Sequence, residues 1–180
     1  NDETVEHLQI ITGELMKGVP EKRPFRVGSF TVIPFYLPHT TRDKDTGQLI
    51  PCFNYGYIVE HEEMGKLLYM TDFEYCKYNF KAMRLNHLVV ECNYCNELVD
   101  KTAENYAHRL KGHCSLDTCK SLVNMNHTAA LRTVTLIHLS NEAADPEQIL
   151  KEIKEAVVWD DALVQIATPG MEVNLDLCPF

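Results

Sequence analysis

Long hydrophobic runs, low-complexity tracts and internal repeats are all absent from this sequence of 180 residues. A membrane-spanning helix needs roughly 18 consecutive apolar residues, and no run in the sequence approaches that length. The first residues also lack the charged, apolar and small-residue pattern of a secretory signal peptide. These absences argue against a repeat protein and a membrane protein, and we expect no membrane partner.

Clusters of basic residues are absent too. The chain holds 17 Lys and Arg against 26 Asp and Glu, which gives a formal net charge of −9. Proteins that bind the backbone of duplex nucleic acid need grouped Lys and Arg to displace counterions, so we expect no strong duplex-binding surface. A nuclease is not excluded, because bound divalent metals supply positive charge locally.

The cysteines indicate a reducing compartment. There are seven, an odd number, so they cannot all form disulfides within the chain. Without a secretory signal, reduced thiols and a cytoplasmic location are the expectation. Ordinary hydrophobic and charged contents of 45% and 24% favour one globular domain over residues 1–180.

Alternating strand and helix patterns predict a layered α/β domain. The polar, charged segment 40–51 is expected to be a loop. A break at Gly28-Ser29 is expected to divide the first strand segment. The predicted strand segments are 25–37, 53–59, 66–70, 87–92, 133–137, 163–167 and 171–175. The predicted helices are 4–16, 78–84, 97–111, 115–125 and 146–158.

Four polar residues lie where apolar strands end or a helix is predicted to begin: His39, Asp72, His113 and His138. A side chain at a strand end is held by a rigid sheet and faces an open edge, which suits a metal or catalytic site. Imidazole and carboxylate are ligands for Zn²⁺, Mn²⁺ or Fe. Three of these residues are candidate ligands, too few for two ions. A structural role for each isolated histidine remains the alternative.

His113 differs, because we expect it to open a helix, where free N–H groups favour an anion. It is a candidate to contact a phosphate or donate a proton, and the alternative is a helix-start residue that contacts only water. Glu91 ends a buried strand and needs a partner. A supporting hydrogen bond to a ligand histidine and an ion pair with Arg109 both meet that need.

The cysteines offer a different metal site. Cys92 and Cys95 have the spacing of a zinc knuckle, and Cys114 and Cys119 are candidates to complete four thiolates. Buried, unpaired thiols are the alternative.

Taken together, these segments resemble the metallo-β-lactamase superfamily, in the branch that contains ribonuclease Z and related phosphodiesterases. The similarity covers roughly residues 25–175, and the ordered combination is more specific than any one piece. The resembling segments are 27–39, 54–60, 66–72, 90–94, Gly112-His-Cys-Ser-Leu-Asp117, Leu136-Ile-His-Leu-Ser140 and 165–173.

The resemblance implies an αββα sandwich, mostly its second half, and a site with two divalent ions, Zn²⁺ or alternatively Mn²⁺. By this resemblance His39 would bind the first metal, His138 the second, and Asp72 would bridge both. His113 would contact the scissile phosphate and assist the leaving group, so that His113 and Asp72 are the expected catalytic residues. Glu91 would support them.

The implied function is a metal-dependent hydrolase, a phosphodiesterase for a nucleotide or short nucleic acid. The alternatives are an incomplete domain of this fold that binds a nucleotide or partner, and a structural protein held by a cysteine site. Relatives often dimerise, so a homodimer is a further expectation.

One signature of the superfamily, H-x-H-x-D-H, is missing from the sequence. Three explanations compete: a first half absent from this chain, loss of the metals with retention of the fold, or a first half on a separate polypeptide. The chain starts with Asn1 rather than Met, which favours the first explanation.

Overall fold

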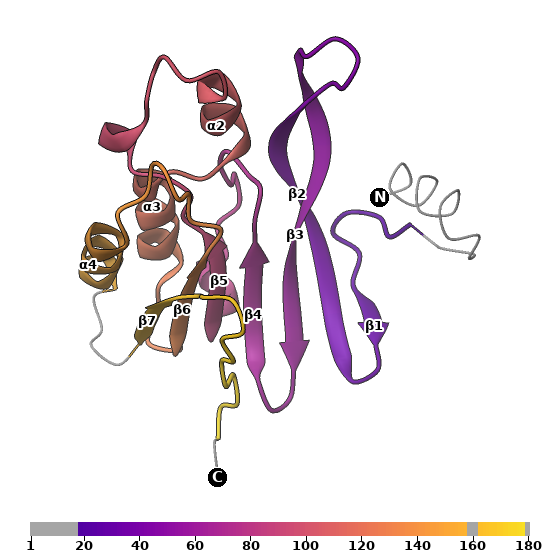
Figure 1. Cartoon of the computed structure of the whole chain (residues 1–180). Coiled ribbons are helices and arrows are strands. Elements are labelled where there is room, and N and C mark those ends of the chain that lie inside the picture. Colours follow the sequence, from indigo (N-terminus) through magenta and orange to yellow (C-terminus); the bar gives the residue numbers. More distant parts are fainter. Residues whose placement is uncertain (1–17, 158–161, 179–180) are drawn as a thin grey trace.

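A seven-stranded mixed sheet organises the chain in the computed structural model, which describes residues 18–157 and 162–178 (Figure 1). The strands lie in the sheet in chain order. β1 to β4 are antiparallel neighbours, and β4 to β7 are parallel. The strands are β1 (Phe25–Val27), β2 (Phe30–Arg42), β3 (Leu49–His61), β4 (Gly65–Met70), β5 (His87–Glu91), β6 (Thr133–Ile137) and β7 (Leu163–Ile166).

The long hairpin of β2 and β3 corrects the predicted loop over 40–51. β2 continues to Arg42 and β3 begins at Leu49, so only a short turn remains between them. Asp43 holds that turn, because its Oδ1 accepts hydrogen bonds from the backbone N–H and the hydroxyl of Thr46, each at 2.7 Å. The prediction was wrong because polar residues can pair in a strand that projects into solvent.

Helices α3 (Leu116–Asn126) and α4 (Pro146–Ala156) cover one face of the parallel part of the sheet (Figure 1). Asp145 caps α4, and its side chain accepts from the backbone N–H groups of two residues in the first turn, while Pro146 occupies the first helical position. The buried residues of α4 recur at helical spacing: Ile149, Ile153 and Ala156. Both helices were predicted from the sequence and are confirmed.

The predicted helix over 97–111 is mostly wrong. Only α2 (Tyr106–Gly112) forms in that region, after a single 3₁₀ turn at Asn96–Leu98. Asp100 explains the difference, because its Oδ1 accepts from the N–H and the hydroxyl of Thr102 at 2.8 and 2.7 Å. This local turn competes with helical hydrogen bonding.

Three further segments differ from prediction or lie outside the structure's description. The segment 78–84 contains a 3₁₀ turn at Lys81–Met83 instead of a longer helix. The expected strand 171–175 is irregular, because Gly170 at φ 81° turns the chain away from the sheet. The expected helix 4–16 lies outside the described residues.

The core lies between the sheet and the helices, and it contains Leu68, Leu88 and Leu136 from three adjacent parallel strands. Each of these side chains is fully buried. The α/β class is confirmed. No helix in the described part of the chain has the length and apolarity to cross a membrane. Because β4, β5 and β6 are parallel, their carboxyl ends meet at one edge of the sheet.

Candidate metal centre

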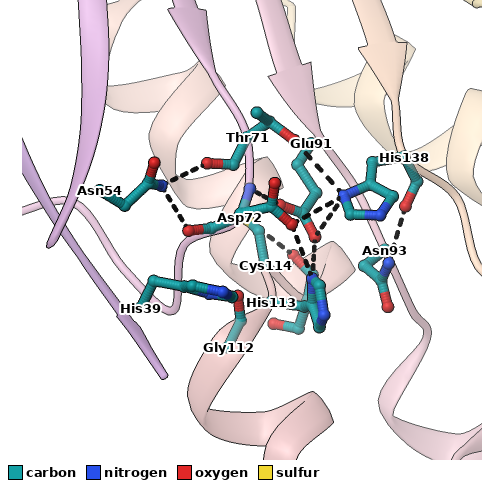
Figure 2. Close-up of polar contacts among 11 residues, drawn as sticks. His39, Asn54, Thr71, Asp72, Glu91, Asn93, Gly112, His113, Cys114 and His138 are labelled. Carbon is teal, nitrogen blue, oxygen red and sulfur yellow. Dashed lines mark hydrogen bonds and ion pairs between the residues drawn. The ribbon is translucent and has the colours of Figure 1, made fainter. Parts of the chain in front are cut away.

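Polar side chains gather at the carboxyl ends of β4, β5 and β6 (Figure 2). Asp72 lies two residues beyond β4, Glu91 ends β5, and His138 directly follows β6. In open α/β sheets, ligands bind outside the carboxyl ends of parallel strands. The sheet therefore brings together residues that are up to 66 positions apart in the sequence (138 − 72).

Four side chains form a compact donor group: Asp72, Glu91, His113 and His138. One donor atom of each lies within 4.8 Å of all the others. Nδ1 of His138 is 3.3 Å from Oδ1 of Asp72 and 3.6 Å from Oε1 of Glu91. Nδ1 of His113 lies 3.7 Å from that Asp72 oxygen. In a tetrahedral site with metal–donor bonds of about 2.1 Å, the donors are about 3.4 Å apart, and the 3.3 Å between Asp72 and His138 fits that spacing.

Glu91 is fully buried at the centre of this group. Its Oε1 accepts a hydrogen bond from Nδ1 of His113 at 2.8 Å, and its Oε2 accepts from the backbone N–H of Asp72. Burial by itself raises the pKa of a carboxyl group. Hydrogen bonds from His113 and His138 outweigh burial here and lower the pKa of Glu91. Glu91 is therefore a buried carboxylate that positions its neighbours.

Asp72 and His138 share an unusual backbone conformation. Their φ angles are 53° and 58°, in the left-handed region that few non-glycine residues adopt. Asn54 holds the turn at Asp72, because its Nδ2 donates to the carbonyl oxygens of Thr71 and Asp72 at 2.7 and 2.6 Å. Asn93 holds the other turn by donating to the carbonyl oxygen of His138 at 2.7 Å. Strain of this kind is common at functional sites.

The acidic surroundings also act on the imidazole of His138. The Glu91 carboxylate raises the pKa of His138 above its ordinary value, with a smaller contribution from Asp72, and burial opposes the shift. A cation at this position is therefore favoured, whether it is a proton or a metal ion.

His113 lies between two helices, which corrects its expected place. It caps the end of α2 as the residue after Gly112, and α3 begins three residues later at Leu116, with Ser115 as its cap. The prediction that free N–H groups of a helix start surround His113 is therefore wrong. Because the charged carboxylate of Glu91 accepts from Nδ1, the proton is on Nδ1 and Nε2 carries a free lone pair.

His39 lies beside the donor group without joining it. Its Nδ1 donates to the carbonyl oxygen of Gly112 at 2.7 Å, which leaves Nε2 as the ligand atom. Its ring centroid is 5.8 Å from that of His113 and 6.0 Å from that of His108. Of the three expected ligands, the structure thus brings Asp72 and His138 into direct contact and places His39 next to them.

Gly112 allows this approach of His39. A Cβ atom at position 112 would lie 3.2 Å from Cε1 of His39, from Cε1 of His108 and from the carbonyl oxygen of Thr40. Sequence reasoning missed His108, Asn54 and Asn93 as site residues. The signal available was two histidines five residues apart, His108 inside the predicted helix 97–111 and His113 just beyond its end. The two asparagines gave no comparable signal.

The structure supports neither an ion pair between Glu91 and Arg109 nor a cysteine metal site. Arg109 pairs with Glu142 at 3.1 Å, and Glu91 contacts the histidines instead. None of the seven cysteines forms a disulfide in the described residues. Burial raises the pKa of Cys114, and the hydrogen bond with Cys114, together with burial, raises the pKa of Cys119, which keeps both thiols protonated. The group of Asp72, Glu91, His113 and His138 is the one candidate metal cluster in the described ranges, so a cysteine site has no support there.

Comparison with known proteins identifies the fold. No protein-family model matches the sequence, and no curated protein matches it. Among solved structures, the metallo-β-lactamase fold protein YhfI of Bacillus subtilis matches 94% of this chain at 19% identity and a TM-score of 0.65. Unliganded yeast PDE1 matches 84% at 20% identity and a TM-score of 0.58. CmlA, a diiron β-hydroxylase from Streptomyces venezuelae, matches 91% at 8% identity and a TM-score of 0.58.

These similarities show that the chain has the metallo-β-lactamase fold, as the sequence resemblance implied. The chain spans 60% of the YhfI chain, 48% of the PDE1 chain and 35% of the CmlA chain. It therefore corresponds to part of each of these longer chains. At these identities, the likeness concerns the fold and not the reaction.

Proposed function

We propose that this chain belongs to a metal-dependent hydrolase, and that it acts on phosphodiesters. The observation that carries the proposal is the group of Asp72, Glu91, His113 and His138, with mutually close donor atoms at the strand ends of a metallo-β-lactamase fold. Two carboxylates and two imidazoles form a donor set suited to Zn²⁺, Mn²⁺ or Fe.

In the proposed centre, Asp72 and His138 would hold divalent ions, Zn²⁺ or alternatively Mn²⁺. His39 would contribute Nε2, since its Nδ1 is engaged by the carbonyl oxygen of Gly112. Bound divalent ions would supply Lewis acidity toward a phosphoryl oxygen and would activate water. These three residues are too few for two ions, so the centre would need donors beyond them.

The residues around the ions have separate tasks. Glu91 fixes the ring of His113 through Nδ1, so Nε2 of His113 is free to face a phosphate oxygen or to hold a proton near a leaving group. The Glu91 carboxylate also accepts the backbone N–H of Asp72, which fixes the position of Asp72 relative to His113. The fixed geometry avoids reorganisation during the reaction.

Two of the similar structures add support for the finer assignment. The name of yeast PDE1 denotes a phosphodiesterase, and CmlA is described as a diiron enzyme. A small nucleotide or a short nucleic acid remains our proposed substrate, because the net charge of −9 disfavours a long duplex. We also retain one domain over residues 1–180, a cytoplasmic location and a homodimer as proposals.

The direct test combines metal titration with hydrolysis of bis(p-nitrophenyl) phosphate. We expect His138→Ala and Asp72→Asn to lower metal affinity by at least about tenfold, with parallel loss of any metal-dependent hydrolysis. His61→Ala is the control, because His61 lies at the opposite end of the sheet, at the end of β3. If the His138 and Asp72 variants bound zinc and manganese as tightly as the parent chain and the His61 variant do, the assignment would be overturned.

The second candidate is a domain that binds a nucleotide without cleaving it. Calorimetric titration with nucleotides, before and after treatment with EDTA, separates the two. Metal-dependent binding followed by turnover supports the hydrolase, whereas equal binding with and without EDTA and no turnover supports the binding domain.

A further inference from the structure

A small cavity lies beside the metal centre, on the side of α2. Its volume is about 180 Å³, and His113 and His138 form the wall that it shares with the centre. The cavity is also lined by His108, Arg109 and Ser140. Pockets that enclose a drug-sized ligand are roughly 300–1,000 Å³, so this one suits a small group and not a whole nucleotide.

The lining of the cavity carries no carboxylate, which sets it apart from the adjoining centre. Neither Asp72 nor Glu91 is among its lining residues. The guanidinium of Arg109 supplies positive charge there, and its side chain is only 11% exposed. A weakly hydrated guanidinium in a cavity without acids favours an anion.

Arg109 retains donors for such an anion. Its ion pair among the described residues joins Nη2 to Oε2 of Glu142, whose side chain is 78% exposed. A guanidinium has five N–H donors in a fixed fork, and this pair uses one nitrogen. Because Glu142 lies in solvent, a better-placed anion can compete with it.

Two neutral groups add donors. Ser140 Oγ accepts from the backbone N–H groups of Glu142 and Ala143, each at 3.2 Å, so its own hydroxyl proton is free to point elsewhere. Nδ1 of His108 is buried, and no group in the described ranges forms a hydrogen bond with it. A buried polar atom of this kind is usually satisfied by a ligand, an ion or water.

We propose that this cavity binds a phosphate group of the substrate that lies next to the phosphodiester being cleaved, with Arg109 as its main contact. Arg109 donates two N–H groups to phosphate oxygens, and Ser140 and His108 contact the remaining oxygens. The inference rests on the proposed hydrolase function for its role in specificity. It restricts the substrate to molecules with at least two phosphates in sequence, such as a short oligonucleotide, and disfavours a cyclic mononucleotide.

Binding of inorganic phosphate to the metal-free chain tests the cavity separately from the reaction. In EDTA, calorimetry is expected to show millimolar affinity for phosphate and much weaker affinity for acetate. Arg109→Gln should weaken phosphate binding by about tenfold or more, since charge-assisted hydrogen bonds are the strong ones. Arg109→Lys should fall between, because it keeps the charge and loses the fork.

Glu142→Gln gives the most specific outcome. Removal of the competing carboxylate should tighten phosphate binding by a few-fold, whereas loss of a merely structural ion pair would not. Arg132→Gln is the matched control, because Arg132 is an exposed arginine at the opposite end of β6. It should leave the affinity unchanged, and circular dichroism should show that every variant is folded.

Three results would overturn the inference: no phosphate binding in the millimolar range, equal binding of acetate and phosphate, or equal loss in the Arg109 and Arg132 variants. The proposed function fails in a different way. If the chain binds phosphate through Arg109 but takes up no metal, the proposal of an anion cavity stands and the proposal of a hydrolase fails.

Discussion

Glu91 and His113 meet across 22 residues of sequence, with Oε1 of the carboxylate 2.8 Å from Nδ1 of the imidazole. The other Glu91 oxygen accepts the backbone N–H of Asp72. One buried carboxylate thus positions a proposed ligand and a proposed proton carrier. Its burial excludes competing water, so both contacts are stronger than at the surface.

We expect Glu91→Gln to lower both stability and metal affinity, although glutamine has nearly the same size as glutamate. The amide presents a donor to a site that needs two acceptors, which leaves either Asp72 N–H or His113 without a partner. The expected loss is about 1–3 kcal/mol in the free energy of unfolding and roughly 10- to 100-fold in metal affinity. Urea denaturation and metal titration measure the two effects. Glu152→Gln on α4 is the control, and a Glu91 variant that matches it would contradict the positioning role.

Gly112→Ala is expected to separate site geometry from stability. Its Cβ would lie 3.2 Å from the His39 and His108 rings, so both rings must shift. Alanine favours the end of α2, and its helix propensity gain of about 1 kcal/mol offsets much of the crowding. We therefore expect nearly unchanged stability with weaker metal binding. In a His39→Ala background the effect on metal binding should be much reduced, and a full effect there would refute the contact.

Asn54 gives a prediction about the turn that holds Asp72. Asn54→Ala leaves the carbonyl oxygens of Thr71 and Asp72 without their donor, at an expected cost of about 1–3 kcal/mol. Asn54→Asp should destabilise more, because a carboxylate would face two carbonyl oxygens. Urea unfolding in EDTA measures this without metal linkage. Asn174→Ala, on an exposed residue, is the comparison, and equal stability of the Asn54 and Asn174 variants would sink the prediction.

His87 predicts how stability depends on pH. It is 1% exposed, and its Nε2 donates to the carbonyl oxygen of Met64 while Nδ1 accepts from the hydroxyl of Thr133. Burial lowers the pKa of His87 below 6.5, so the folded state holds the ring neutral and the unfolded state protonates first. Stability should therefore be full above about pH 6.5 and should decrease as the pH falls below it.

Denaturation in EDTA at pH 7.5 and pH 5.5 measures this effect. His87→Gln cannot take up the proton, so the difference between the two pH values should shrink in that variant. His61→Gln is the control, because His61 is only partly buried, at the end of β3. An unchanged pH difference in the His87 variant would show that other groups carry it.

The strand ends could be predicted from the sequence because apolar runs and the polar residues that follow them are local features. Asp72 and His138 were placed correctly for this reason, and the parallel pairing of β4, β5 and β6 brings their ends together. The start of α4 could be predicted for the same reason, since Asp145 and Pro146 act within one turn of the helix.

The failures have equally specific causes. Asp100 accepts hydrogen bonds from Thr102, and this turn replaces most of the predicted long helix. The predicted loop was wrong because polar residues extend β2 and β3, and only the turn at Asp43 remains between them. The pairing of Glu91 with His113 depends on where α2 ends relative to β5, which no short window of sequence contains. No sequence pattern marked Gly112 as the position whose missing Cβ admits His39.

The left-handed backbone at Asp72 and His138 has a consequence for the history of the fold. Glycine at either position would relieve backbone strain of roughly 1 kcal/mol. A domain of this fold that does not need these side chains for catalysis would therefore be more stable with glycine there. We therefore expect glycine to replace Asp72 and His138 in relatives that have lost catalytic activity. This chain carries an aspartate and a histidine at these positions, as the proposed metal centre requires.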